Sequence, residues 1–154
     1  MRVRGPISLP SKVSEGILRT LPKWFGDEQS LTEYAANTET LATFVAESEG
    51  VCAFLSLRPH FDRAWEIDCI AVASHHRRGG VGRQLLGEAE RWLKSQGANL
   101  LQVKTLAEAH PSSEYAETRR FYIGAGFQPL EVFPALWAPH LPVLLMVKFL
   151  EHAS

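Results

Sequence analysis

The chain has 154 residues, of which 45% are hydrophobic and 21% are charged, and its formal net charge is −1. These values are typical of an ordinary globular protein, so we expect a single domain over residues 1–154. The small net charge argues against nucleic acid or an anionic membrane as a partner, and no apolar run reaches the roughly 18 to 20 residues that span a bilayer. The basic N-terminus lacks the apolar stretch of a secretory signal, which favours a cytoplasmic location.

The pattern of apolar residues predicts a mixed succession of helices and strands. In chain order we expect a helix over residues 13–25 interrupted near Pro22, a helix over 30–37, a hairpin of strands 41–46 and 51–57, a strand over 65–72, a helix from residue 81 that stops at Gly97, a strand over 100–106, a helix over 113–125, and strands over 127–133 and 141–149. Residues 133–142 are expected to form a loop. This order predicts a mixed α/β or α+β domain built on one sheet.

The cysteines and histidines are poorly placed for a disulfide framework or a metal site. Cys52 and Cys69 both lie in strand-like runs and read as buried free thiols. The pair His75 and His76 has no cysteine or carboxylate companion at a ligand-like spacing, so we expect no metal.

A glycine-rich turn spans residues 75–82 and reads HHRRGGVG. It leads into a long helix, whose first N–H groups have no internal partner and whose dipole favours an anion. Three glycines within four residues let such a ligand approach bare backbone, and two arginines stand beside them although cations oppose the dipole. A bound polyanion would resolve that conflict. The alternative is a basic, solvated turn that binds nothing.

The spacing of the glycines in this turn distinguishes between several known classes of nucleotide-binding loop. The residues after Gly82 lack the third small residue of the dinucleotide fingerprint, and no Gly-Lys-Ser/Thr follows, which argues against a P-loop. The pattern Arg77-x-x-Gly80-x-Gly82 instead resembles the pyrophosphate-binding loop of the GNAT family of N-acetyltransferases.

The resemblance continues on both sides of the turn. The strand before it ends in Ile70-Ala71-Val72, and about forty residues later a helix carries an aromatic-Tyr pair that ends at Tyr122. The match covers roughly residues 41–149. It implies a GNAT-like fold, α/β (α+β), with a single mixed, mainly antiparallel sheet flanked by helices and a central strand-loop-helix coenzyme A site.

The resemblance also implies which groups bind the coenzyme. Main-chain groups of Ile70 and Val72 would hold the pantetheine arm, with the Ile70 amide near the thioester oxygen. Many relatives have an asparagine that contacts the coenzyme seven residues before the tyrosine, where this chain has Tyr115. Either Tyr115 replaces that contact or the helix starts differently in this chain. The implied coenzyme-binding residues are Ile70, Ala71, Val72, Arg77, Arg78, Gly79, Gly80, Val81, Gly82, Arg83 and Tyr115.

Tyr122 matches the family tyrosine that protonates the departing thiolate. A phenol with a pKa near ~10 can donate to that sulfur as the thioester bond breaks. The alternative is a packing role beside Phe121.

Glu66 stands six residues before Val72, where histone-type GNAT enzymes carry their general base. Asp68 follows two residues later, and two close carboxylates would raise the pKa of one of them, as a base requires. The alternatives are a solvated strand edge, an ion pair with Arg63, or a substrate-binding role in an enzyme that deprotonates the amine through water.

The resemblance therefore implies an enzyme that moves an acetyl group from acetyl-CoA to a primary amine by direct attack in a ternary complex, without a metal. The acceptor, a small molecule or a protein, is not defined by the sequence. One alternative is a non-catalytic acyl-CoA sensor, and another is an interaction domain whose glycine turn binds nothing. A homodimer is a further expectation, because dimers are common among GNAT relatives. Aromatic and histidine side chains expected near the acceptor are Trp24, Phe25, Tyr34, Phe133, Trp137 and His140.

Overall fold

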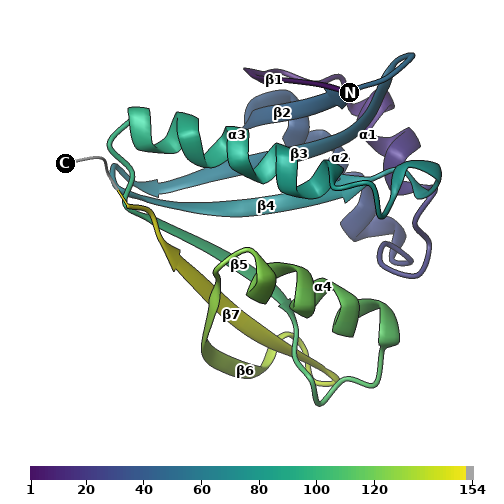
Figure 1. The fold of residues 1–154 in the computed structure, drawn as a ribbon. Coiled ribbons are helices and arrows are strands. Elements are labelled where there is room, and N and C mark those ends of the chain that lie inside the picture. The colour runs from purple at the N-terminus through teal and green to yellow at the C-terminus, as the bar shows by residue number, and fades with distance from the viewer. Residues whose placement is uncertain (152–154) are drawn as a thin grey trace.

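The computed structural model describes residues 1–151, which form one seven-stranded sheet flanked by four α-helices (Figure 1). The elements are β1 (Arg2–Ile7), α1 (Ser11–Leu18), α2 (Glu28–Thr40), β2 (Ala42–Glu47), β3 (Val51–Phe61), β4 (Ala64–Val72), a short 3-10 turn (Ser74–His76), α3 (Val81–Ser95), β5 (Leu100–Leu106), α4 (Ser113–Gly124), β6 (Gln128–Ala138) and β7 (Leu141–Phe149).

The sheet has the order β1-β2-β3-β4-β5-β7-β6, and only β4 and β5 are parallel. This confirms the predicted mixed, mainly antiparallel sheet. The pairing of β4 with β5 runs only from Ala64 opposite Leu100 to Ile67 opposite Val103. Beyond these residues the two strands diverge, and Figure 1 shows the sheet split between them. The split exposes one backbone edge of each strand at the centre of the sheet.

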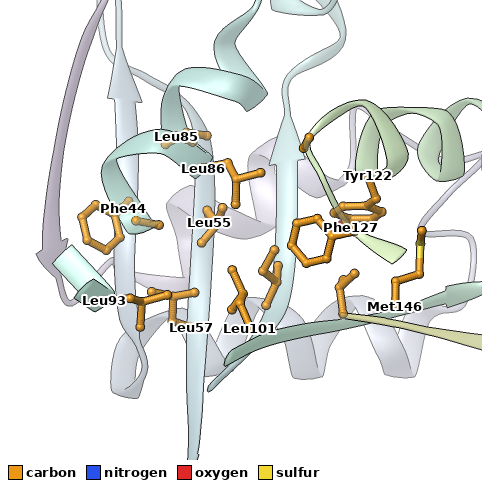
Figure 2. Close-up of a cluster of buried hydrophobic side chains, with 14 of the residues drawn as sticks. Phe44, Leu55, Leu57, Leu85, Leu86, Leu93, Leu101, Tyr122, Phe127 and Met146 are labelled. Atoms are coloured by element: carbon orange, nitrogen blue, oxygen red, sulfur yellow. The ribbon is translucent and has the colours of Figure 1, made fainter. Parts of the chain in front are cut away.

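Both faces of the sheet are covered by helices where the core lies. α3 and α4 pack on one face, here called the α3 face, and α1 and α2 pack on the other, the α1 face. Figure 2 shows the core of the α3 face, where helix residues such as Leu85 and Leu93 meet strand residues such as Leu55 and Leu101. All four are fully buried, and each such side chain stabilises the fold by about 1.5–3 kcal/mol relative to exposure. The split sheet is therefore held by a continuous core.

A β-bulge in β4 interrupts the alternation of its side chains. The neighbouring β3 residues Ser56 and Leu57 pair with Cys69 and Ile67, so Asp68 is an extra residue without a partner on β3. Ile67 packs in the core of the α3 face, whereas Cys69 packs in the core of the α1 face. The predicted strand over residues 65–72 therefore does not alternate regularly beyond Ile67. The bulge turns Cys69 away from the face that Ile67 occupies.

Three other segments differ from the sequence expectation. The first helix ends at Leu18 and not near residue 25, because Pro22 disfavours helical geometry in the residue before it. β1 was not expected and pairs with β2 at the edge of the sheet. The predicted loop over residues 133–142 is wrong, because β6 continues to Ala138 and only two residues connect it to β7.

Cys52 and Cys69 are both buried free thiols, as expected. Within residues 1–151 no helix combines the length and apolarity needed to cross a membrane. Over the same range, no three His, Cys, Asp or Glu side chains gather in a way that could hold a metal ion.

Candidate active site

A cleft of about 300 Å³ lies where β4 and β5 diverge. Its walls come from the second half of β4, the start of α3, residues 103–105 of β5, α4 and the loop that follows α1. Trp137 of β6 completes it. The cleft therefore collects segments from most of the chain at the one place where the sheet is open.

The start of α3 offers the cleft a set of unpaired N–H groups. Gly80 precedes the helix with a φ of 80°, and no side chain caps the helix. The Gln84 N–H bonds to the Gly80 carbonyl, while the N–H groups of Val81, Gly82 and Arg83 have no partner among the described residues. The first turn contains no acidic residue that would compensate the helix dipole. These groups can bind an anion such as a phosphate.

Gly82 also allows α3 and α4 to approach each other. A Cβ atom at this position would lie 3.2 Å from the ring of Phe121. Any larger residue would push Phe121 outward, or would fill the cleft that both residues line. The geometry therefore fits the glycine that the sequence pattern singled out.

The exposed edge of β4 provides a second set of polar groups. The Ala73 N–H donates to the Cys52 carbonyl of β3 at 2.8 Å. Because successive residues of a strand direct their backbone groups to opposite sides, the N–H and C=O groups of Ile70 and Val72 point away from β3. β4 has no strand on that side beyond Ile67, so these groups face the cleft. They can hydrogen-bond an extended ligand as a missing strand would.

The three arginines near the turn have different environments. Arg77 stacks on the Trp24 ring, with its guanidinium carbon 4.2 Å from the centroid, and its Nη2 lies 3.2 Å from Glu117 Oε1. Arg78 and Arg83 line the cleft and form no ion pair with any described residue. Two cations are therefore available to an anion bound at the start of α3, whereas Arg77 is already engaged.

Tyr122 is buried in the core of the α3 face and reaches the cleft. Its ring packs edge-on against Phe121 and Phe127, with centroid distances of 5.3 and 5.4 Å. Figure 2 shows Phe127 beside it. No described residue hydrogen-bonds its hydroxyl group, and the residue lines the cleft. Burial raises the pKa of Tyr122 well above its ordinary value, with a smaller contribution from Cys69. The hydroxyl is therefore a protonated donor at any physiological pH.

Tyr115 uses its hydroxyl within the protein. The group donates to the main-chain carbonyl of Trp24 at 2.8 Å, and the Trp24 indole N–H donates back to Glu114 O and Thr118 Oγ1 of α4. These bonds tie the loop after α1 to α4, and both segments line the cleft. Tyr115 thus lines the cleft and fixes its shape.

Glu66 lies beside the cleft and is held by three side chains. His60 Nε2 lies 2.6 Å from Glu66 Oε1, Gln102 donates at 3.1 Å, and Lys104 Nζ lies 3.3 Å from Oε2. Burial acts to raise the pKa of Glu66, but the hydrogen bonds from His60 and Gln102 and the charge of Lys104 outweigh it and leave the pKa lowered. The expectation that Asp68 would raise this pKa is wrong. The alternative of an ion pair with Arg63 is not observed, because Glu66 pairs with His60 and Lys104.

Asp68, unlike Glu66, lines the cleft itself. Arg58 Nη2 lies 3.0 Å from Asp68 Oδ1, and Asn37 donates to Oδ2 at 3.2 Å. Its place in the β4 bulge directs it to this position. Lys104 also lines the cleft and links it to Glu66. Sequence reasoning missed Lys104, although a cationic residue within the expected strand 100–106 was a usable signal.

Most of the residues predicted from the sequence come together at the cleft. Those that line it are Ile70, Val72, Arg77, Arg78, Gly80, Val81, Gly82, Arg83, Tyr115 and Tyr122. Ala71 points to the α1 face, and Gly79 and Glu66 are not among the lining residues. Of the residues expected near the acceptor, Trp24, Phe25, Tyr34 and Trp137 line the cleft, whereas Phe133 and His140 do not.

Comparisons with known proteins agree with this architecture. A GNAT-family protein from Desulfovibrio desulfuricans has a TM-score of 0.81 at 22% identity, covering 97% of this chain and 99% of that one. An aminoglycoside 6'-N-acetyltransferase solved with coenzyme A has a TM-score of 0.78 at 18% identity, covering 100% and 99%. The ribosomal-protein-S18-alanine N-acetyltransferase of Escherichia coli has a TM-score of 0.78 at 18% identity, covering 99% and 96%. A search of curated proteins finds no significant match.

The structural similarities establish the fold, and a family comparison extends them to the sequence. Residues 13–127, well over half of the chain, match the acetyltransferase (GNAT) family. The matched residues include the glycine turn and Tyr122. The chain therefore belongs to the GNAT family of acyl-CoA-dependent N-acetyltransferases.

Proposed function

We propose that the protein transfers an acetyl group from acetyl-CoA to a primary amine by direct attack in a ternary complex. The observation that carries this proposal is the convergence on one cleft of the unpaired N–H groups of α3, the free edge of β4 and the Tyr122 hydroxyl. The N–H groups of α3 can hold a pyrophosphate, and the free edge of β4 can hold an extended pantetheine arm. The Tyr122 hydroxyl can protonate the departing sulfur.

The diphosphate of the coenzyme binds at the start of α3. The N–H groups of Val81, Gly82 and Arg83 are its hydrogen-bond donors, and the side chains of Arg78 and Arg83 are its cations. Gly79 and Gly80 contribute by leaving the approach to these groups free of side chains. Arg77 joins this site when it exchanges Glu117 for a phosphate.

The pantetheine arm lies along β4 and adds to the open edge of the sheet. Main-chain groups of Ile70 and Val72 hold it, and Ala71 between them anchors the strand in the core of the α1 face. The Ile70 N–H is the donor for the oxyanion that develops when the amine attacks the thioester.

Tyr122 donates its proton to the coenzyme sulfur as the carbon–sulfur bond breaks. Its raised pKa keeps it protonated, so the donor is always in place. Direct attack is favoured over an acetyl-enzyme intermediate, because the cysteine in the cleft, Cys69, is buried and burial raises the pKa of its thiol. A thiol in that state is a poor nucleophile.

Glu66 takes up the proton that the amine loses. Glu66 is ionised at neutral pH like any carboxylate, its lowered pKa makes it a weaker base than the sequence pattern suggested, and it does not line the cleft itself. A water molecule beside Lys104 carries the proton from the acceptor to this carboxylate. Asp68, which lines the cleft, holds the ammonium form of the acceptor before it is deprotonated.

The acceptor binds between the aromatic side chains that line the outer part of the cleft. They are Trp24, Phe25, Tyr34 and Trp137. Two proteins of the same fold act on an aminoglycoside and on a ribosomal protein, so both small-molecule and protein amines are candidates. A cytoplasmic location and a homodimer stay predictions.

A thiol-release assay on a panel of amines tests the proposal, with the Tyr122→Phe variant as the inactive control. Turnover by the wild type that this variant lacks would support the enzyme. Tight acetyl-CoA binding without turnover on any amine, protein N-termini included, would favour the sensor.

A further inference from the structure

One buried hydroxyl group in the cleft has no hydrogen-bond partner. Thr105 of β5 is 3% exposed, and its Oγ1 atom is buried without a donor or acceptor among the described residues. Leaving such a group unsatisfied costs about 1–3 kcal/mol. The side chain lines the cleft, two residues beyond the last pair between β4 and β5.

The other buried serine and threonine hydroxyl groups within residues 1–151 all have hydrogen-bond partners in the protein. Thr38 bonds to the carbonyls of Leu9 and Ala35, and Ser14 shares a 2.9 Å bond with it. Thr43 and Ser56 share a 3.1 Å bond between β2 and β3. Thr105 is thus the exception, and it occurs where β5 loses its neighbour and a ligand would take its place.

The direction of the Thr105 side chain indicates which of the two bound substrates its hydroxyl group would contact. Val103 packs in the core of the α3 face, and Thr105, two residues later on the same strand, points to the same face. Tyr122 and the start of α3 belong to this side, whereas Lys104 points to the other. The hydroxyl therefore faces the coenzyme side of the cleft and not the acceptor side.

We propose that Thr105 is a coenzyme-positioning residue, whose hydroxyl donates a hydrogen bond to a carbonyl oxygen of the bound acyl-pantetheine arm. The arm carries amide and thioester carbonyls, and it lies opposite β5 once it adds to the free edge of β4. This inference rests on the proposed function. It adds a side-chain contact from β5 to the backbone contacts from β4, so that both sides of the split sheet hold the arm.

The test is the Thr105→Val variant, which keeps the shape of the side chain and removes the hydroxyl. Without ligand its melting temperature should equal or exceed that of the wild type, because no protein hydrogen bond is lost. Its Kd for acetyl-CoA, measured by calorimetry, should rise about 10-fold, which corresponds to ~1.4 kcal/mol. Thr105→Ser should restore the wild-type Kd.

Thr43→Val is the matched control. It removes a buried hydroxyl on β2 that bonds to Ser56 and to the Leu41 carbonyl, and Thr43 does not line the cleft. We expect a lower melting temperature and an unchanged Kd, the reverse of the Thr105→Val result. Repeating the titration with coenzyme A locates the contact. A loss with both ligands assigns it to an amide of the arm, and a loss with acetyl-CoA alone assigns it to the acyl carbonyl.

Two results would overturn the inference. Thr105→Val could bind acetyl-CoA as tightly as the wild type, or it could lose thermal stability as Thr43→Val does, which would show that the hydroxyl is satisfied in the free protein. Absence of acetyl-CoA binding by the wild type would instead defeat the proposed function itself.

Discussion

The role of Tyr122 can be tested by deleting a single oxygen atom. In Tyr122→Phe the ring keeps its contacts with Phe121 and Phe127, and no hydrogen bond to the protein is lost. The free energy of unfolding should therefore change by no more than about 0.5 kcal/mol. Loss of a general acid costs roughly 10²- to 10⁴-fold in rate, which is about 3–5 kcal/mol in activation free energy. We expect that loss in kcat, with the Kd for acetyl-CoA unchanged.

Tyr115→Phe is the control on the same helix. Its hydroxyl donates to the Trp24 carbonyl at 2.8 Å, so its removal should destabilise the fold by about 1 kcal/mol and lower the melting temperature by a few degrees. It should leave kcat within a few-fold of the wild type. Steady-state thiol release and thermal unfolding of both variants separate the two roles. A Tyr122→Phe variant with the kcat of the wild type would refute the proposed proton transfer.

Three further predictions concern the coenzyme site and the titrating groups. Gly80→Glu should abolish acetyl-CoA binding in calorimetry, because it places bulk and negative charge where the phosphates bind. Gly97→Glu is the control: Gly97 has a similar φ of 85° at the other end of α3, so this variant should show the same backbone strain and bind acetyl-CoA normally. Binding by both variants would contradict the assignment of the phosphate site. Burial raises the pKa of all three tyrosines, so the free energy of unfolding should not depend on their titration below about pH 10 and should fall above it, where the tyrosines of the unfolded chain ionise. Absorbance at 295 nm reports tyrosine ionisation. Ionisation in a protein that is still folded would contradict this expectation. The pKa of Glu66 is lower in the folded chain than its value near ~4.3 in the unfolded chain, so Glu66 stabilises the fold above that pH and loses this contribution as the pH falls. Glu66→Gln should therefore flatten the acid limb of the curve of stability against pH, and it should reduce kcat at pH 7. An unchanged kcat would exclude Glu66 as the base.

The parts of the site that depend on local sequence could be predicted. The glycine turn follows from the needs of a helix N-terminus, and the structure places Gly80 at a positive φ before α3. The position of Tyr122 follows from a motif of neighbouring residues, and the structure brings it to the same cleft. Both signals lie within short segments, where spacing alone defines the geometry.

The features that depend on pairing between distant segments could not be predicted. Residues 65–72 fit a regular alternating strand as well as a bulged one, so only the register with β3 reveals the bulge at Asp68. The pKa of Glu66 was expected to reflect its sequence neighbour Asp68, but it is determined by donors on β3 and β5. The contact of Tyr115 with Trp24 joins residues 91 positions apart, which no local pattern encodes.

Thermal unfolding with and without acetyl-CoA tests the central claim most directly, because it requires no knowledge of the acceptor. At about 100 times its Kd, the coenzyme should add roughly 2.7 kcal/mol to the free energy of unfolding and raise the melting temperature by several degrees. Gly80→Glu should show no such shift, and Gly97→Glu should show the full shift. A wild-type melting temperature that does not change with saturating acetyl-CoA would contradict the assignment of the cleft as a coenzyme site.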